Sequence, residues 1–516
     1  MFKNLASVAG LTLLSRITGF FRDVVLGAVL GAGALADAFY VAFRLPNHFR
    51  AIFGEGAFNA AYVPSYARVL ETQGESAAQR FASQILTLLL LSQLVLLALA
   101  WTFMPQVVSL LAPGFSDEPE KFEAAVTLSR ITFPYLLFIT LVTLYAGTLN
   151  ARRYFAAAAF APVLLNVVMI ACLALAFLFP TAAHGAAWGI TISGALELLF
   201  LIEAARRARA LAGIAKPSWG ADVKQFFSAF LPAVIGSAGV QIALFADTII
   251  ASLLPTGSVS AIYYADRIYQ LPIGVIGIAA GTVLLPEMSR HLAAGDKEAA
   301  AAAQNRTMSI TLAVSAPFVV AFLMLPDLII RGVFLRGAFT EAAAKESAQV
   351  LFAYGTGLLA MVLIRSAVAS FQAQGDTRTP MMISLSAVAL NVIAKLFLYE
   401  PYGAAGLAYA TALGAWINFA LLVIIALKRG WMQLDPRLVR VGISVANAAF
   451  GVFLVALLSV APLSRFAQSL TQYSTELTLV LVGLAGAILY GLVLILSLTS
   501  YGVPLWQRET KDKSDA

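Results

Sequence analysis

Long, uninterrupted apolar segments are the feature that most constrains the fold of this chain. One of them, ILTLLLLSQLVLLALAWTF at 85–103, carries no charged side chain. Of the 516 residues, 60% are hydrophobic and 12% are charged, against about 25% charged residues in soluble globular domains. A bilayer accepts such segments only as helices or as strands of closed barrels, and barrel strands alternate strictly in polarity. We therefore expect an all-α polytopic membrane protein.

At roughly 20 apolar residues per span, the sequence predicts about 14 transmembrane helices. Their expected ranges are 5–30, 34–64, 82–104, 126–149, 155–179, 185–203, 226–253, 259–286, 306–325, 347–371, 381–398, 403–427, 439–461 and 477–499. Lys and Arg concentrate in alternate loops, which places both termini in the cytoplasm. The opposite side holds only Lys121, Arg331, Arg336, Lys345 and Arg465.

Short segments recur along the chain at a nearly constant offset. FRDVVLGA (21–28) is similar to FADTIIAS (245–252), AFYVAFRLP (38–46) to AIYYADRIY (261–269), YVPSYAR (62–68) to LLPEMSR (284–290), and LNVV (165–168) to LNVI (390–393). The order is conserved between the two copies, so we infer a duplication. We expect two parallel six-helix lobes, 1–215 and 216–430, followed by two extra helices within 431–500 and a cytoplasmic tail, 501–516. Repeats of this kind place a site between lobes.

Ionisable side chains interrupt the apolar spans at few positions. They concentrate in the first two predicted helices and in the matching part of the second repeat: Arg16, Arg22, Asp23, Asp37, Arg44, Arg50 and Glu55, then Asp247, Asp266 and Arg267. An intramembrane charge costs about 2.5–3.5 kcal/mol on insertion scales, so it usually faces water or another charge. Guanidinium groups present forked donors to phosphate and carboxylate oxygens. We expect Arg16, Arg22, Arg50 and Arg267 to border a cavity that binds an anion such as a diphosphate.

The alternative is that each arginine pairs with a nearby carboxylate and only holds helices together. For Arg22 and Asp23, adjacency does not predict pairing, because consecutive side chains on a helix point about 100° apart.

The sequence shows few features of disulfide, nucleotide-binding, catalytic or metal-binding chemistry. The single cysteine, Cys172, excludes a disulfide framework, and no GxxxxGK[ST] loop for a nucleotide is present. The acidic loop with Asp117, Glu118, Glu120 and Glu123 is interpreted as a solvated surface rather than as a catalytic or metal-binding cluster. We expect no enzyme, no cofactor and no nucleic-acid partner.

Three runs carry a resemblance to a known family: SRITGFFRDVVLGAVLGAG (15–33), ADAFYVAFRLPNHFRAIFGEGAFNAAYVPSY (36–66) and YYADRIYQLPIGVIGIAAGTVLLPEMSR (263–290). They resemble the MurJ (MviN) family of lipid II flippases, in the multidrug/oligosaccharidyl-lipid/polysaccharide exporter superfamily. The segment PNHFRAIFGEGAF is the most specific to that family. The likeness covers nearly the whole chain, including the two trailing helices.

The resemblance implies a bacterial inner-membrane transporter that moves lipid II, the undecaprenyl-diphosphate-linked peptidoglycan precursor, to the outer leaflet by alternating access. It implies that Arg16, Arg22, Arg50 and Arg267 line a cationic cavity and contact the diphosphate, with Asp23 and Glu55 beside them. A chloride ion in that cavity is compatible with the same charges. The trailing helices would form a groove for the prenyl tail, and membrane lipids and cell-wall synthesis proteins are candidate partners.

Some family members hold sodium in the second lobe, with ligands that match Asp247, Asn391 and Thr411 here. A further carboxylate of that site falls at Lys395, which argues against a sodium site in this chain. We expect an internal Asp247–Lys395 pair instead.

Three other functions remain open from the sequence. An exporter of drugs or of another polyprenyl-linked glycan would share the fold, but cationic drugs would need an acidic lining. A membrane glycosyltransferase would need a carboxylate base or metal-binding acids at an aqueous face. A scaffold for wall synthesis would tolerate loss of Arg22 or Arg267.

Overall fold

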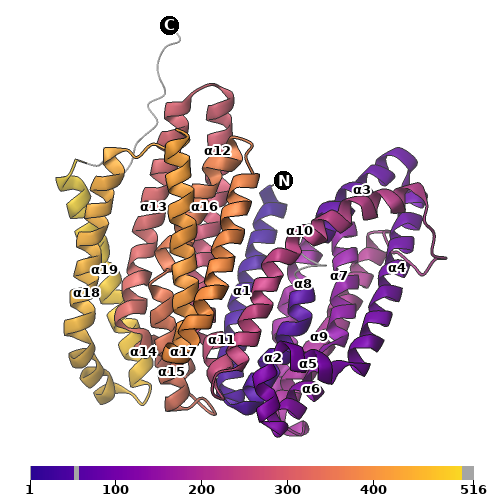
Figure 1. Ribbon diagram of the computed structural model, residues 1–516, viewed down its shortest axis with the longest axis horizontal. Helices are drawn as coiled ribbons and strands as arrows, with labels where there is room; N and C mark the ends of the chain where they lie inside the picture. Colours follow the sequence, from indigo (N-terminus) through magenta and orange to yellow (C-terminus); the bar gives the residue numbers. More distant parts are fainter. Residues whose placement is uncertain (1, 51–56, 503–516) are drawn as a thin grey trace. The chain divides into compact units, whose positions relative to one another are not determined.

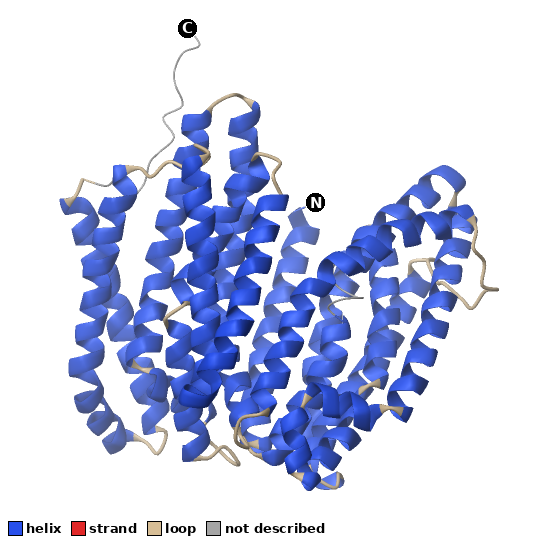
Figure 2. Cartoon of the chain, in the orientation of Figure 1, coloured by secondary structure: helices blue, strands red, loops and turns tan. Residues whose placement is uncertain are grey.

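The computed structural model describes residues 2–50 and 57–502, and every regular element in these ranges is helical (Figure 2). The predicted all-α class is therefore confirmed. Glu55 and residues 503–516 of the predicted tail lie outside the described residues.

The helices follow one another along the chain with short connections (Figure 1). Their bounds are α1 Phe2–Leu30, α2 Ala34–Arg50, α3 Ala57–Gln73, α4 Glu75–Thr102, α5 Met104–Leu111, η2 Pro113–Asp117, α6 Pro119–Thr132, α7 Pro134–Ala151, α8 Phe155–Ala174, η3 Ala176–Leu178, α9 Ala182–Arg207, α10 Ala221–Ser252, α11 Ser258–Pro272, η4 Ile273–Gly277, α12 Ile278–Ala293, α13 Lys297–Met324, α14 Pro326–Phe334, α15 Glu341–Gly355, α16 Leu358–Ala373, α17 Arg378–Lys428, α18 Pro436–Leu470 and α19 Ser474–Ser500.

Several predicted spans are broken helices. The range 126–149 falls on α6 and α7, which part before Pro134, because proline has no N–H to donate and favours the first turn of a new helix. The range 347–371 falls on α15 and α16, which part at Gly357, where a Cβ atom would lie 2.5 Å from the Ala412 backbone. Hydropathy does not change across such breaks, so the sequence pattern missed them.

Nine helical segments among the described residues are long and apolar enough to cross a membrane. They are Glu75–Thr102, Pro119–Ala151, Phe155–Ala174, Ala182–Arg207, Lys297–Met324, Glu341–Ala373, Arg378–Lys428, Pro436–Leu470 and Ser474–Ser500. The chain is therefore a multi-pass membrane protein, and the count of 14 spans stays a prediction.

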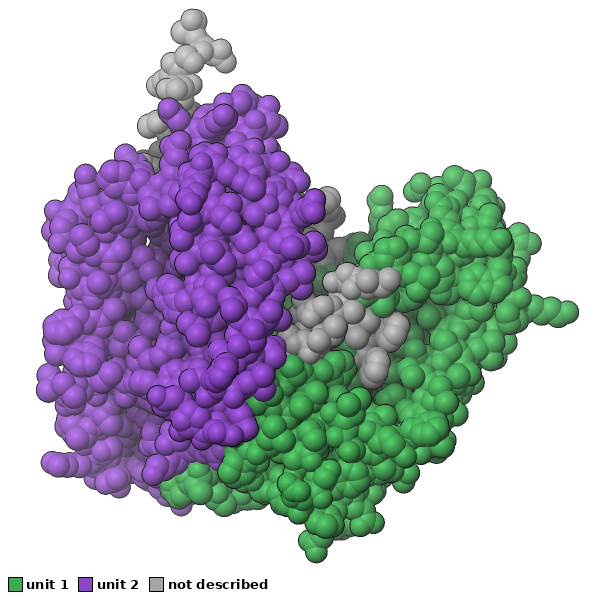
Figure 3. Space-filling view, in the orientation of Figure 1, with its two compact units in different colours: residues 1–264, 334–343 green, residues 265–333, 344–516 purple. Residues whose placement is uncertain are grey.

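The chain divides into two compact units, shown in Figure 3. Unit 1 comprises Met1–Tyr264 and Phe334–Ala343, and unit 2 comprises Ala265–Val333 and Ala344–Ala516.

Unit 1 includes α10, which follows the first sequence repeat, because an aromatic cluster joins α10 to α3 and α4. The Phe58 ring lies 5.6 Å from Phe226 and 5.9 Å from Phe230, and the Tyr62 ring lies 5.9 Å from Phe81. Buried aromatic side chains contribute more packing area per residue than any others. They therefore hold the start of α10 within unit 1.

The segment Phe334–Ala343 belongs to unit 1 because its backbone binds the end of α1. The Ala338 N–H donates to the Ala28 carbonyl at 2.7 Å. Gly31 has a φ of +67°, and a Cβ atom there would lie 2.4 Å from the Ala338 carbonyl oxygen. Only glycine combines that dihedral angle with so close an approach.

In unit 2, α17 is two helices that fold back on each other. Gly403 has non-helical angles with φ +55° and follows Pro401, so the helix reverses there. As a result, the Arg429 guanidinium after the end of α17 donates to the Asp376 carboxylate before its start, at 2.7 Å. The predicted spans 381–398 and 403–427 correspond to the two halves.

We expect replacement of Asp376 with asparagine to lower the unfolding temperature of the solubilised protein at neutral pH. Hydrogen bonds from the Thr379 hydroxyl and N–H, with the Arg429 guanidinium, lower the pKa of Asp376 from 3.8 to about 2. Because the folded pKa is depressed, the stabilisation is present above 3.8 and is lost as the pH falls toward about 2. The difference in unfolding temperature between wild type and variant should shrink over that interval. A constant difference would contradict the assignment.

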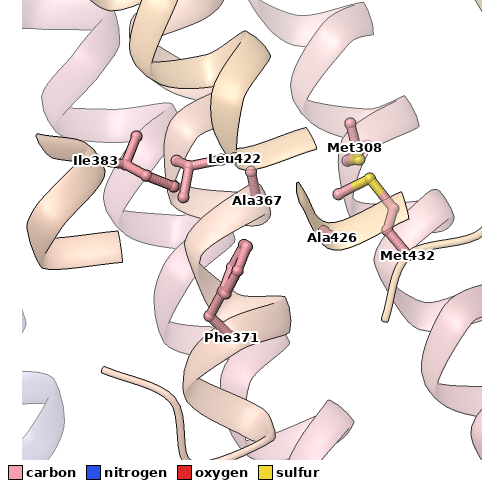
Figure 4. Packing of buried hydrophobic residues seen from close by; sticks show 7 residues of the cluster. All are labelled: Met308, Ala367, Phe371, Ile383, Leu422, Ala426 and Met432. Carbon is pink, nitrogen blue, oxygen red and sulfur yellow. The ribbon is translucent and has the colours of Figure 1, made fainter. Parts of the chain in front are cut away.

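The core of unit 2 is apolar. Figure 4 shows one cluster in which α13, α16 and α17 bury Met308, Ala367, Phe371, Ile383, Leu422, Ala426 and Met432. A second cluster joins the trailing helices to α13: Val441, Val445, Ala448 and Val452 of α18 pack with Tyr490 and Leu498 of α19 and with Ala316.

Candidate functional site

Arg22 and Asp23, in the second half of α1, form a buried ion pair in unit 1. Arg22 is 7% exposed and Asp23 4% exposed. The Arg22 Nε and Nη2 atoms donate to Asp23 Oδ1 at 3.0 and 2.7 Å, and Nη1 donates to Asn166 Oδ1 at 2.9 Å. A guanidinium group at this depth is thus fixed by a carboxylate on its own helix and an amide on α8.

Arg22 and Asp23 do pair, although their adjacency in the sequence did not predict it. Their Cβ atoms do diverge around the helix, but arginine has a long, flexible side chain and donors along the edge of a flat group. It bends back around the helix to reach the neighbouring carboxylate. For Arg22, therefore, the alternative of pairing with a nearby carboxylate holds in this structure.

Close packing of α1 and α8 places Asn166 at this pair. A Cβ atom on Gly19 would lie 3.4 Å from Asn166 Nδ2, so the two helices are in van der Waals contact at this point. Asn166 Nδ2 donates to the Ser15 carbonyl at 3.0 Å and to the Thr18 hydroxyl at 3.1 Å. Asn166 was not among the predicted site residues, although it is the second residue of one of the repeated LNV segments.

A tyrosine completes the cluster around Asp23. The Tyr263 hydroxyl donates to Asp23 Oδ1 at 3.0 Å, and the Tyr263 ring stacks on Tyr40 at 4.0 Å. We call Arg22, Asp23, Asn166 and Tyr263 the Arg22 cluster.

The other predicted arginines are more exposed to solvent than Arg22 is. Arg16 is exposed on α1. Arg50, at the end of α2, is half-buried, and its Nε donates to Asn47 Oδ1 at 3.1 Å. Arg267 is half-buried on the part of α11 that belongs to unit 2.

The residues predicted for an ion site or an internal pair divide between the units. Asn391 and Lys395 lie one turn apart on the first half of α17, and Thr411 lies on its second half. Lys395 is 1% exposed, while Asn391 and Thr411 are half-buried. Asp247 is half-buried on α10 in unit 1. The Asp247–Lys395 pair stays a prediction.

A second polar cluster in unit 1 centres on Asp37, which is fully buried near the start of α2. Its carboxylate accepts from the Gly257 N–H at 2.7 Å, the Ser260 N–H at 2.9 Å and the Ser260 hydroxyl at 2.6 Å. Asp37 therefore caps the first turn of α11 from a different helix, where a negative charge also meets the positive end of the helix dipole. The contact joins the first sequence repeat to the second.

Lys121 of α6 joins the same cluster. Its Nζ lies 3.4 Å from Asp37 Oδ2 and donates to the Thr256 hydroxyl at 2.9 Å. Glu118 accepts from Thr256 at 2.7 Å, and this hydrogen bond, with the Lys121 ammonium, lowers the pKa of Glu118. We call Asp37, Lys121, Glu118, Thr256 and Ser260 the Asp37 cluster.

Glu118 is exposed, in agreement with the interpretation of the acidic loop as a solvated surface, although its carboxylate accepts a hydrogen bond from Thr256. Lys121, in the same loop segment, is 3% exposed, although the sequence placed it in an external loop. Asp117, Glu120 and Glu123 are exposed as expected. No sequence signal links residues 37 and 121 to residue 260, because the contact forms only in the folded chain.

Within residues 2–50 and 57–502, no group of three or more His, Cys, Asp or Glu side chains could hold a metal ion. A cavity of about 420 Å³ lined by Leu149, Arg153, Tyr154, Phe155 and Ala204 contains none of the predicted site residues. One buried acid also escaped the sequence analysis: Glu197, inside the apolar helix α9.

Comparison with known proteins places the chain in a family. The family model described as "Lipid II flippase MurJ" matches residues 26–494. A "Probable lipid II flippase MurJ" of Rhizobium meliloti (strain 1021) is 41% identical over 455 residues, which cover 87% of this chain and 85% of the relative. A "Lipid II flippase MurJ" of Burkholderia cenocepacia is 33% identical over 456 residues, covering 87% and 88%.

Solved structures agree on the fold. A "Lipid II flippase MurJ, inward closed conformation" matches with a TM-score of 0.78 at 24% identity, covering 96% of this chain and 99% of that one. An inward-facing multidrug resistance MATE transporter of the MOP superfamily matches with a TM-score of 0.66 at 16% identity, covering 82% and 97%. The expected resemblance is thus confirmed: the chain belongs to the MurJ family of lipid II flippases, a family of membrane transporters.

Proposed function

We propose that this protein translocates lipid II from the inner to the outer leaflet of the bacterial inner membrane by alternating access. The observation that carries the proposal is the guanidinium group of Arg22, which is buried and held within the Arg22 cluster. A fixed guanidinium inside a membrane protein stabilises an anion with a positive charge and with directed hydrogen-bond donors. The lipid interior provides neither.

In this proposal the diphosphate of lipid II is the group recognised. Arg16, Arg22, Arg50 and Arg267 contact its oxygens, with Asp23 and Glu55 as neighbouring acids. Asp23 and Asn166 hold the Arg22 guanidinium in one orientation before substrate arrives, which reduces the entropy lost on binding. The prenyl tail stays in lipid, against the trailing helices α18 and α19.

The transport cycle follows from the repeats. We propose 14 spans, with lobes 1–215 and 216–430, extra helices within 431–500 and both termini in the cytoplasm. The Asp37 cluster joins residues of the two repeats at the external end and holds that end closed until substrate has bound. After release the emptied site is net positive, and an inside-negative potential favours its return by about 2.3 kcal/mol per charge moved across 100 mV.

We propose that no sodium ion binds in the second lobe of this chain. The family resemblance places Lys395 at a position where other members have a carboxylate ligand, and its side chain is almost completely buried, so we propose that its ammonium group takes the place of the cation. The repeat supports this proposal: Asp247 and Asn391 correspond to Asp23 and Asn166, which hold the guanidinium of Arg22 in unit 1. We propose that the ammonium group of Lys395 pairs with the carboxylate of Asp247, as the guanidinium of Arg22 pairs with Asp23.

Reconstitution in liposomes tests the function. We expect the purified protein to move labelled lipid II between leaflets, and the rate to fall when the membrane potential is collapsed with an ionophore. A rate that is unchanged without the potential would reject the voltage-driven return. Equal transport of another polyprenyl-linked glycan would favour a broader exporter, and no lipid transport at all would favour a scaffold.

A further inference from the structure

The cavity of about 420 Å³ in unit 1 lies at the shared end of three membrane-spanning segments. Its lining comes from the last turn of α7, the loop that follows, the first turn of α8 and Ala204 near the end of α9. These helices belong to the apolar segments Pro119–Ala151, Phe155–Ala174 and Ala182–Arg207, each long enough to span a bilayer. The ends of spanning segments meet the lipid headgroups, so the cavity lies at the boundary between the apolar core of the membrane and water.

The lining of this cavity combines one charged group with an apolar wall. Arg153 supplies a guanidinium group, and both Arg153 and Tyr154 are exposed. Phe155 and Ala156 supply apolar surface beside them. Helix α8 continues away from the cavity with exposed apolar side chains such as Val167, which is 50% exposed. The arrangement fits a molecule that has an anionic head and an apolar body.

Arg153 has a backbone conformation that favours glycine. Its φ is +66°. The Arg153 N–H donates to the Asn150 carbonyl at 2.9 Å, and the Tyr154 N–H donates to the Leu149 carbonyl at 2.9 Å. This pair of hydrogen bonds ends a helix with one left-handed residue, which is usually glycine because any side chain costs stability there.

The second sequence repeat has glycine at the matching helix ends. Gly375 follows α16 with a φ of +79°, and the same pair of hydrogen bonds forms around it as around Arg153 after α7. Arg209 follows α9 with a φ of +54°, and its counterpart after α17 is Gly430, with a φ of +67°. Unit 1 therefore keeps two arginines where glycine would relieve the backbone, which indicates that their side chains have a use.

Guanidinium groups outnumber carboxylates at this end of unit 1. Arg206 and Arg207 share Glu203, at 3.7 and 2.8 Å. Within the described ranges, the side chains of Arg153 and Arg209 form no ion pair. A positive surface at the headgroup boundary attracts anionic lipids. Of these four arginines, Arg153 is the one that lines the cavity.

We propose that this cavity binds the headgroup of an anionic phospholipid, with Arg153 as the residue that recognises the phosphate. The guanidinium donates to the phosphodiester oxygens, and the Tyr154 ring lies at the level of the headgroups. The acyl chains lie along the exposed apolar surface of α8. With both termini in the cytoplasm, as proposed above, this end of unit 1 is in the inner leaflet. The site is separate from the one assigned to the diphosphate.

A phospholipid fits this cavity better than a soluble anion does. A small hydrophilic anion would contact one charged group and would lose hydration against the apolar wall. A phosphodiester carries one negative charge, which matches the single guanidinium of Arg153, and its acyl chains contact the apolar surface. We therefore expect a lipid such as phosphatidylglycerol, in which the charge and the apolar body belong to one molecule.

Binding of phosphatidylglycerol with a fluorescent acyl chain to the solubilised protein tests the proposal. We expect Arg153→Gly to raise the Kd roughly tenfold or more, because hydrogen bonds to a charged phosphate are lost. Arg209→Gly is the matched control, since it removes the same charge from the same end of unit 1 at an equally strained position. Arg209 does not line the cavity, so the Kd should stay close to the wild-type value.

Two further measurements separate binding from folding. Arg153→Gly should unfold close to the wild-type temperature in the absence of lipid, because glycine relieves the positive φ. Ala204→Phe fills the cavity from α9 while Arg153 is kept, and it should also weaken binding. A clearly lower unfolding temperature in Arg153→Gly would show that the arginine serves the fold, and would overturn the proposal.

An unchanged Kd in Arg153→Gly or in Ala204→Phe overturns the proposal, and so does an equal loss of binding in Arg209→Gly. Equal binding of phosphatidylcholine, whose headgroup has no net charge, would show that the charge is not recognised. Displacement of the labelled lipid by inorganic phosphate would assign the cavity to a free anion instead. None of these measurements involves lipid II, so the proposed function stands or fails separately.

Discussion

Arg22→Ala abolishes lipid II translocation, and removing Asp23 in the same chain does not restore it. Alone, the alanine variant leaves Asp23 buried without its guanidinium, and breaking a buried pair in this way costs about 3–5 kcal/mol of stability. It would also remove the hydrogen bonds that we propose Arg22 makes to the diphosphate, each worth about 1.5–3 kcal/mol, or roughly ten- to a hundredfold in affinity. The single variant should therefore lose both stability and transport.

The double variant Arg22→Ala/Asp23→Ala separates these two losses. Removing both charges relieves the uncompensated carboxylate, so the unfolding temperature should recover toward wild type while transport stays absent. Both are measured on the same solubilised and reconstituted protein. If transport returns with stability, Arg22 only holds helices together, and the role assigned to its guanidinium is wrong.

Asp37→Asn destabilises the protein and opens the contact between the two repeats. The asparagine keeps the shape of the side chain, but it cannot accept from Gly257 and Ser260 on both sides. It also removes the buried carboxylate that lies 3.4 Å from Lys121 and leaves that ammonium group only the exposed Glu118 at 3.3 Å among its two carboxylate partners. We expect a loss of about 3–5 kcal/mol, seen as a lower unfolding temperature. Glu123→Gln, an exposed change on the same helix as Lys121, is the control and should have no effect.

Thiol labelling shows whether that contact holds the external end closed. In a background with Cys172 replaced by alanine, Ala261→Cys places a thiol at a fully buried position on α11. We expect a membrane-impermeant reagent to label it faster when Asp37→Asn is added. Unchanged labelling in a less stable protein would mean that the Asp37 cluster stabilises unit 1 without acting as a closure.

The helices could be predicted from the sequence because apolar runs are a local property. The sequence also indicated where the chain reverses inside α17, because Pro401 and Gly403 stand between two apolar runs. Breaks inside a span, as at Pro134, were missed because hydropathy continues across them. The membership of α10 in unit 1 could not be predicted, since it depends on Phe226 meeting Phe58 from a distant part of the chain.

The site was harder to predict because its geometry is tertiary. The sequence identified Arg22 and Asp23, but it could not show that the guanidinium bends back onto its neighbour. Asp37 stood out as an intramembrane charge, and its partners Lys121 and Ser260 did not, because nothing in their local sequence is unusual. Glu197 could have been found, because one acid in an otherwise apolar span is a sign of function.

The central claim is that a guanidinium cluster inside this membrane protein carries lipid II across the bilayer. The most direct test measures how much lipid II becomes accessible to a membrane-impermeant reagent outside cells whose own flippase has been depleted. Expression of this chain should restore accessibility, and Arg22→Ala or Arg267→Ala at equal expression should not. Full accessibility with either variant would contradict the claim.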